Sequence, residues 1–193
     1  MTTSHRVRQP SSSATGFTLI ELMVTLAVIA ILAAVALPAM QGMLVSNRLV
    51  SQTNEIVAAI QFARGEATRL NTPVVFCRAT AVDDTVCSAA ADAWPAWIVV
   101  APALAQPVLR SGPVDPRLVL RTSGNVGTAI TFRPDSLAWR NATTLLAGAL
   151  RVCAPSDATN VNARRVLIAN GSRVSTETLE QGAGGCNDVV AEP

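Results

Sequence analysis

Residues 16–37 read GFTLIELMVTLAVIAILAAVAL, and this stretch decides how the rest of the chain is organised. Between Phe17 and Leu37 the only ionisable side chain is Glu21. A helix needs about 20 apolar residues to cross a bilayer. The 21 residues from Phe17 to Leu37 are therefore long enough to do so. The stretch predicts a helix that lies in a membrane or in an equally apolar environment.

Glu21 is the residue that such an environment penalises. An acid near the middle of a membrane span costs roughly 2.5–3.5 kcal/mol, and less towards the end of the span, where Glu21 lies. One interpretation is that the carboxylate reaches back to the lipid headgroups. The other is that Glu21 has a functional partner, because charges inside membranes are usually paired.

Two ways of processing the N-terminus are consistent with this pattern. The segment before Phe17, MTTSHRVRQPSSSATG, is basic and rich in small polar residues. A secretory signal would be cut after the apolar run, and residues 34–36 (Ala-Val-Ala) have the small-x-small pattern of such a site. That cut would leave a chain starting at Leu37 and would discard Glu21. It would not explain why helical periodicity continues directly afterwards.

The six residues 16–21 (GFTLIE) resemble the class III leader junction of type IV pilins and type II secretion pseudopilins. The resemblance implies that a prepilin peptidase cuts between Gly16 and Phe17, N-methylates Phe17 and leaves the apolar run in place. It also implies a partner for Glu21, which would pair with the terminal amine of a neighbouring subunit during assembly.

Helical periodicity resumes after Pro38. Apolar residues recur at intervals of three, four or seven and form one stripe: Val45, Leu49, Ile56, Ile60, Ala63, Ala67 and Leu70. Asn71-Thr72-Pro73 ends the pattern. A helix over 17–70 would be about 80 Å long. We expect its second half to pack this stripe on a folded domain.

From Pro73 onwards the chain consists of short β-branched runs separated by turn-forming residues. The expected strands are 73–77, 97–100, 107–110, 117–121, 129–133, 149–153, 164–169 and 172–176. Residues 133–136 and Asn170-Gly171 are expected hairpin turns. The predicted fold class is α+β, a long N-terminal membrane-spanning helix packed on a mostly antiparallel β-sheet domain. We expect a leader over 1–16, a membrane and filament-core helix over 17–42, and a periplasmic domain over 43–193.

The second half of the chain resembles the GspH/FimT/FimU group of minor pilins and pseudopilins. The stretches that carry this resemblance are FARGEATRLNTPVVFC at 62–77, AWIVV at 96–100, AITFRPDS at 129–136 and ARRVLIANGSRVS at 163–175. It implies a minor type IV pilin that primes assembly and sits in the tip complex. The alternatives are a GspH-type pseudopilin of type II secretion and a FimT-type pilin that binds DNA for transformation. The implied partners are prepilin peptidase, other pilins or pseudopilins, and an inner-membrane assembly platform.

Composition argues against an enzyme. The only histidine, His5, lies in the expected leader, so the processed chain would contain no imidazole for Ser-His-Asp or Cys-His catalysis or for metal binding. The acids are not paired at any motif spacing, and no Gly-rich phosphate loop occurs. We therefore expect no catalytic residue, cofactor or metal.

Four cysteines, Cys77, Cys87, Cys153 and Cys186, indicate disulfides in an exported domain. A zinc site would need all four thiolates at an unusual spacing. Three pairings exist, and we favour Cys77–Cys87 with Cys153–Cys186, because each bond then closes one polar or Gly-rich loop beside an expected strand.

The arginines are the remaining candidate site. The chain has 15 arginines, no lysine and 13 acids; without Arg6 and Arg8 of the leader its formal charge is zero. In the DNA-binding FimT branch the equivalent segment looks like Gly-Arg-x-Arg, whereas this chain has GSRVS at 171–175. Only one of the two motif arginines is therefore matched, by Arg173. Alternation along a strand sends Arg164 and Arg165 to opposite faces, so at most one of them joins Arg173. We therefore expect weak DNA binding or none.

Overall fold

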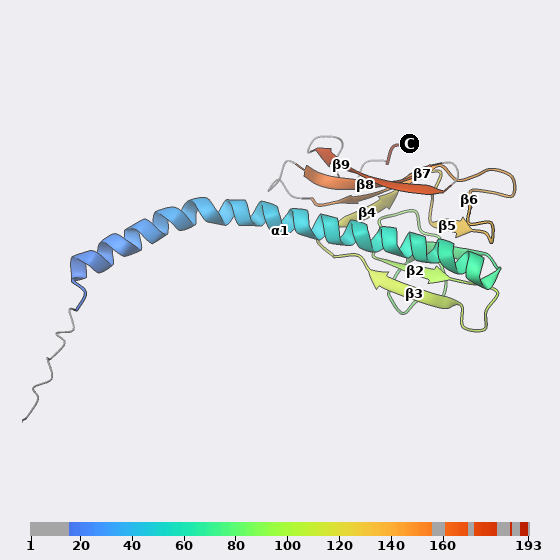
Figure 1. The fold of residues 1–193 in the computed structure, drawn as a ribbon, viewed down its shortest axis with the longest axis horizontal. Helices are drawn as coiled ribbons and strands as arrows, with labels where there is room; N and C mark the ends of the chain where they lie inside the picture. Colours follow the sequence, from blue (N-terminus) through green and yellow to red (C-terminus); the bar gives the residue numbers. More distant parts are fainter. Residues whose placement is uncertain (1–15, 156–160, 170–171, 181–185, 187–189, 193) are drawn as a thin grey trace, which may run out of the picture. The chain divides into compact units, whose positions relative to one another are not determined.

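The computed structural model describes residues 16–155, 161–169, 172–180, 186 and 190–192 (Figure 1). The chain forms two compact units, one up to Ala39 and one from Met40 onwards. One helix comes first and is followed by strands only, in the order α1, then β1 to β9, within the described residues. The expected α+β class is confirmed.

Helix α1 spans Leu19–Leu70, as the periodicity predicts. At its C-terminus Asn71 adopts a left-handed conformation, with φ of 49°. The Thr72 N–H donates to Ala67 O at 3.3 Å and the Asn71 N–H to Thr68 O at 3.3 Å. These two bonds form a Schellman motif with asparagine in the position usually held by glycine. The helix therefore ends where the sequence signal placed its end.

The second half of α1 buries the predicted stripe. The buried residues of this face include Leu49, Ile56, Ala59, Ile60, Ala63 and Ala67, while Val45 and Leu70 pack at its ends. Two polar residues, Gln52 and Thr53, are also buried here. Gln52 Oε1 accepts a hydrogen bond from the Asp115 N–H at 2.9 Å, which ties α1 to the segment after β3.

The strands form two antiparallel sheets. The first has the order β3-β2-β1-β5-β6, with β1 Val74–Ala79, β2 Ala96–Val100, β3 Val108–Pro113, β5 Ala129–Phe132 and β6 Ala138–Trp139. The second has the order β4-β7-β8-β9, with β4 Val119–Thr122, β7 Gly148–Cys153, β8 Val161–Ala169 and β9 Arg173–Glu180. All eight predicted strands are present, and the two-residue β6 is an addition.

One hydrophobic core joins α1 to both sheets. Phe76 of β1 packs between Trp94 and Trp97, with ring centroids 5.5 and 5.8 Å apart. Leu120, Leu150 and Val166 bring the second sheet into the same cluster. In Figure 1 the later turns of α1 run along both sheets. Because side chains alternate along a strand, the opposite faces of both sheets point away from this core.

Each sheet carries one disulfide on the face that points away from the shared core. Cys77 of β1 is bonded to Cys87, and Cys153 of β7 is bonded to Cys186, the two pairs favoured from the sequence. Cys77 belongs to a smaller apolar cluster on the outer face of the first sheet. The described part of the C-terminal segment contains Val190, which is buried.

Candidate functional site

The N-terminal junction forms a capped helix start. Thr18 precedes α1, and its Oγ1 accepts a hydrogen bond from the Glu21 N–H at 3.2 Å. Its carbonyl accepts a second bond from the Leu22 N–H at 3.2 Å. The spacing Thr-x-x-Glu is that of a capping box, and a carboxylate in the first turn also complements the helix dipole. The sequence contains this Thr-x-x-Glu spacing, but sequence reasoning missed that Thr18 caps the helix.

Glu21 lies exposed in that first turn. Among the described residues its carboxylate has no hydrogen-bond or ion-pair partner. Phe17, the expected new terminus, lies four positions earlier and is 81% exposed. The carboxylate is therefore accessible to a cationic group from outside the chain.

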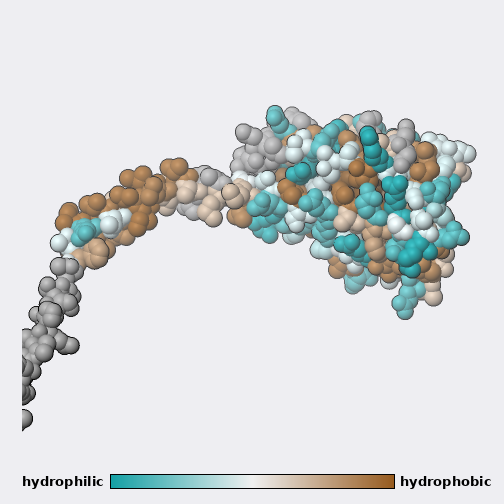
Figure 2. All heavy atoms as spheres, in the orientation of Figure 1, coloured by the Kyte–Doolittle hydropathy of each residue, from teal (hydrophilic) through white to brown (hydrophobic). Residues whose placement is uncertain are grey.

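The first half of α1 exposes a continuous apolar surface. Every residue from Gly16 to Ala36 is exposed, including the large side chains of Leu26, Ile29 and Leu32. Figure 2 shows this segment as mostly brown spheres, with a few teal and pale ones near its N-terminal end, in contrast to the mixed surface of the second unit. By length and composition α1 can cross a membrane. A surface of this size requires lipid or other apolar helices as its neighbours.

The candidate DNA-binding arginines do not form one surface. Arg164 shares the core-side face of β8 with Val166, and its Nε is buried. Arg165 lies on the outer face, where it forms an ion pair with Glu177 of β9. Arg173 is exposed, but it pairs with Ala169, four residues along β8 from Arg165. The two outer-face arginines are therefore about 13 Å apart along the strand.

Sequence reasoning missed a row of charges that crosses the second sheet. Arg121 of β4 lies opposite Arg151 of β7, Arg151 lies opposite Arg165 of β8, and Arg165 lies opposite Glu177 of β9. Arg151 is only 5% exposed. Both Arg121 and Arg151 have interaction partners of their own. Most of this row is therefore part of the packing of the domain.

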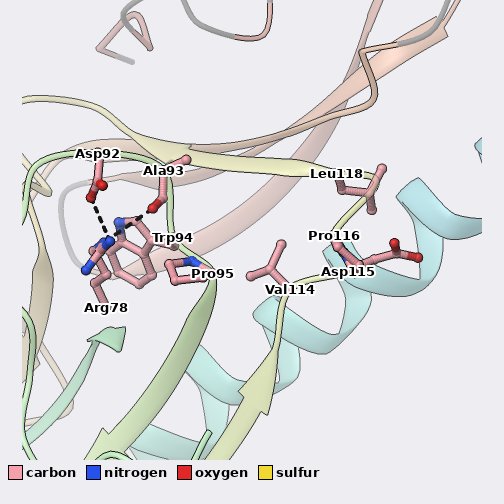
Figure 3. Close-up of a pocket in the computed structure, with 9 residues that line it drawn as sticks. All are labelled: Arg78, Asp92, Ala93, Trp94, Pro95, Val114, Asp115, Pro116 and Leu118. Carbon is pink, nitrogen blue, oxygen red and sulfur yellow. Dashed lines mark hydrogen bonds and ion pairs between the residues drawn. The ribbon is translucent and has the colours of Figure 1, made fainter. Parts of the chain in front are cut away.

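The surface also contains a hollow of about 410 Å³ between the residues before β2 and those before β4 (Figure 3). The Arg78 guanidinium in it is fully engaged, with Nη2 2.7 Å from Asp92 Oδ1, Nη1 2.6 Å from Ser88 Oγ and Nε 3.3 Å from Ala93 O. Hydrogen bonding by the Arg117 backbone N–H lowers the pKa of Asp115, the second carboxylate of this hollow.

The residues that line this hollow include no thiol, hydroxyl or imidazole. Both carboxylates of the hollow are engaged in ion pairs, Asp92 with Arg78 and Asp115 with Arg117. No group of three or more metal-ligating side chains occurs elsewhere in the described ranges.

Two family models match the chain. The model described as Type II transport protein GspH matches residues 52–172, more than half of the chain. The chain belongs to the GspH family. The model of the prokaryotic N-terminal methylation motif matches residues 11–37, which include the capped junction and the exposed apolar segment. The two matches together identify a type IV pilin-like protein of the GspH family.

Two solved structures, both of the type IV minor pilin FimU from Pseudomonas aeruginosa, are similar to this GspH family member. In one crystal form the identity is 18%, with 67% of this chain and 92% of FimU covered and a TM-score of 0.47. In the other the identity is 18%, the coverage 68% and 90%, and the TM-score 0.48. No curated protein sequence matches the chain.

Proposed function

We propose that the chain is a minor type IV pilin with a structural, non-enzymatic role. Prepilin peptidase removes residues 1–16 and methylates Phe17. Residues 17–42 then hold the subunit in the inner membrane, with residues 43–193 in the periplasm. The assembly platform moves it into a filament, where it primes pilus assembly and lies in the tip complex with other minor pilins.

The observation that carries this proposal is the state of Glu21. An acid in the first turn of an exposed apolar helix, without a partner among the described residues, requires a cation from outside the chain. The methylation-motif match over residues 11–37 supports the neighbouring subunit's terminal amine as that cation. The attraction would be strong in the apolar interior of a filament, because charges interact more strongly at low dielectric.

The test is Glu21→Ala in the full chain. This variant should still be inserted and cleaved, because the substitution makes the span more apolar, but it should enter filaments poorly. Thr25→Ala is the matched control: within the described ranges its hydroxyl bonds only to Leu22 O of the same helix, so filament entry should be unchanged. Normal incorporation of Glu21→Ala would refute the role of the carboxylate. A processed chain that starts at Leu37 would refute the pilin assignment itself.

A GspH-type pseudopilin is the second candidate, and it is favoured because the matching family is that of a type II transport protein. The four cysteines, by their resemblance to pilus subunits, favour the pilus. A deletion strain separates the two machines by surface pili, twitching, secreted enzymes and transformation frequency. Loss of secretion with normal twitching would reject the pilus.

DNA binding is the third candidate, and the arrangement of the arginines speaks against it. Arg165 is neutralised by Glu177, and Arg164 lies on the core-side face of β8, so Arg173 is the one exposed cation of the three. One or two phosphate contacts give a shallow dependence on salt and low affinity. Micromolar binding in a fluorescence titration, abolished by Arg173→Ala, would make DNA uptake the leading function.

A further inference from the structure

Two arginines share an apolar hollow on the second unit. The hollow has a volume of about 280 Å³ and is lined by Val45 and Arg48 of α1, Arg117 and Leu118 before β4, and Ala154 and Pro155 after β7. Three segments that are far apart in the sequence therefore place two guanidinium groups around one apolar floor. The hollow is separate from the one that Arg78 borders, although Leu118 lines both.

The two guanidinium groups have spare hydrogen-bonding capacity. Arg117 uses its Nε on Asp115 Oδ1 at 3.2 Å, and its side chain remains 64% exposed. Arg48 has no hydrogen-bond or ion-pair partner in the part of the chain that the structure describes; its charge acts on Asp115 only through space. Among the described residues, two cations thus lie near one carboxylate, Asp115, which already accepts bonds from Arg117. The hollow has a positive rim and an apolar interior.

This combination selects a ligand with an anionic head and an apolar body. Arginine binds phosphate through two parallel N–H groups, which makes it the preferred residue for phosphate recognition. Val45 and Leu118 provide the contact for the apolar part of the ligand. The shared chemistry is that of a phosphate ester attached to a hydrocarbon.

The position of Arg48 in the sequence points to a lipid as the source of that phosphate. Arg48 is the first charged residue after Glu21, and Met40, Met43 and Leu44 between them are exposed. If Glu21 lies at one membrane surface, a span of about 20 residues ends near Gln41. Arg48 then lies about 10 Å further along the helix, within reach of the headgroups when its long side chain extends towards them.

We propose that Arg48 and Arg117 bind the phosphate of an anionic phospholipid while the subunit waits in the membrane. The contact holds the folded domain against the bilayer surface and is broken when the subunit moves into a filament. The proposal rests on the membrane insertion proposed above. A carboxylate of another subunit is the competing occupant of the hollow.

The test uses the full chain in detergent and in nanodiscs. Native mass spectrometry measures the binding of phosphatidylglycerol and of phosphatidylcholine to the same protein. A basic residue near an anionic surface raises affinity about fivefold, so the two arginines, partly offset by Asp115, should give phosphatidylglycerol a preference of roughly tenfold. The double variant Arg48→Gln/Arg117→Gln should bind both lipids equally.

Two variants control for fold and for total charge. Arg140→Gln removes one exposed arginine between β6 and β7, outside the hollow, and should leave the preference unchanged. Arg48→Lys/Arg117→Lys keeps the charge and should retain a weaker preference, because lysine lacks the two-pronged geometry. Circular dichroism of each variant establishes that it is folded.

Three outcomes would overturn the proposal. Equal binding of both lipids by the wild type, combined with failure of the double variant to enter filaments, would assign the hollow to contact with another subunit. Free glycerol phosphate that binds as tightly as the lipid would remove the membrane from the explanation. A chain that does not insert into phosphatidylcholine nanodiscs at all would refute the insertion itself, which separates that failure from a failure of lipid selectivity.

Discussion

Removal of the two disulfides one at a time should destabilise the fold by different amounts. The bonds close loops with sequence separations of 33 residues for Cys153–Cys186 and 10 residues for Cys77–Cys87. The loop-closure entropy of the unfolded chain then predicts that the longer loop's disulfide stabilises the fold by about 3.7 kcal/mol at 25 °C, and the shorter loop's by about 2.7 kcal/mol. Alanine at both positions of a pair avoids leaving a buried thiol or hydroxyl.

The packing around each bond modifies this difference only slightly. Val190 stays buried and the Glu192 carboxylate accepts a hydrogen bond from the Asn125 N–H at 2.7 Å, so the C-terminal segment keeps contacts of its own. On the other sheet, the Asp84 carboxylate accepts hydrogen bonds from Thr80 and Ala81 and holds the loop locally. We therefore expect Cys153→Ala/Cys186→Ala to cost about 1 kcal/mol more than Cys77→Ala/Cys87→Ala.

The assay is urea unfolding of the full chain in detergent micelles, followed by tryptophan fluorescence. Trp94 and Trp97 are buried in the core shared by both sheets, so their emission reports global unfolding of the second unit. Non-reducing peptide mapping first establishes the pairing in the purified protein. The entropic argument would be refuted if removing Cys77–Cys87 lowered the free energy of unfolding more than removing Cys153–Cys186. It would also be refuted if removing Cys153–Cys186 lowered it by less than about 1 kcal/mol.

Three further predictions concern single residues. Gln52→Leu should cost about 1–3 kcal/mol in urea unfolding, because the Asp115 N–H loses its acceptor, and an unchanged midpoint would contradict this. Gly112→Ala should cost about 1–3 kcal/mol because its Cβ would overlap the Trp97 ring, whereas Gly65→Ala, with open space around it, should be neutral or stabilising. The pKa of Asp115 lies below its usual range, chiefly because the Arg117 backbone N–H donates to the carboxylate. The resulting stabilisation is fully present above about pH 4 and is lost as the pH falls through the lowered pKa, so the stability gap between wild type and Asp115→Asn should close in acid.

The features that the sequence determined by itself depend on local signals. The helix ends at Leu70 because Asn71, Thr72 and Pro73 act within one turn of it. The strand runs and the apolar stripe of α1 follow from periodicity, which reports which face of each element is buried. The N-terminal junction is equally local, since Thr18 and Glu21 lie three residues apart. Most of the candidate function could therefore be predicted without coordinates.

The features that only the tertiary structure decided depend on which strands are neighbours and in what register. The alternation of side chains along a strand is enough to place Arg164 and Arg165 on opposite faces. The ion pair of Arg165 with Glu177, however, depends on the alignment of β8 with β9. In the same way, Gln52 accepts a hydrogen bond from the Asp115 N–H, and Arg48 and Arg117 line one hollow, across more than sixty positions of sequence. Such contacts are specified by the summed packing of many elements, and no short window of sequence contains that information.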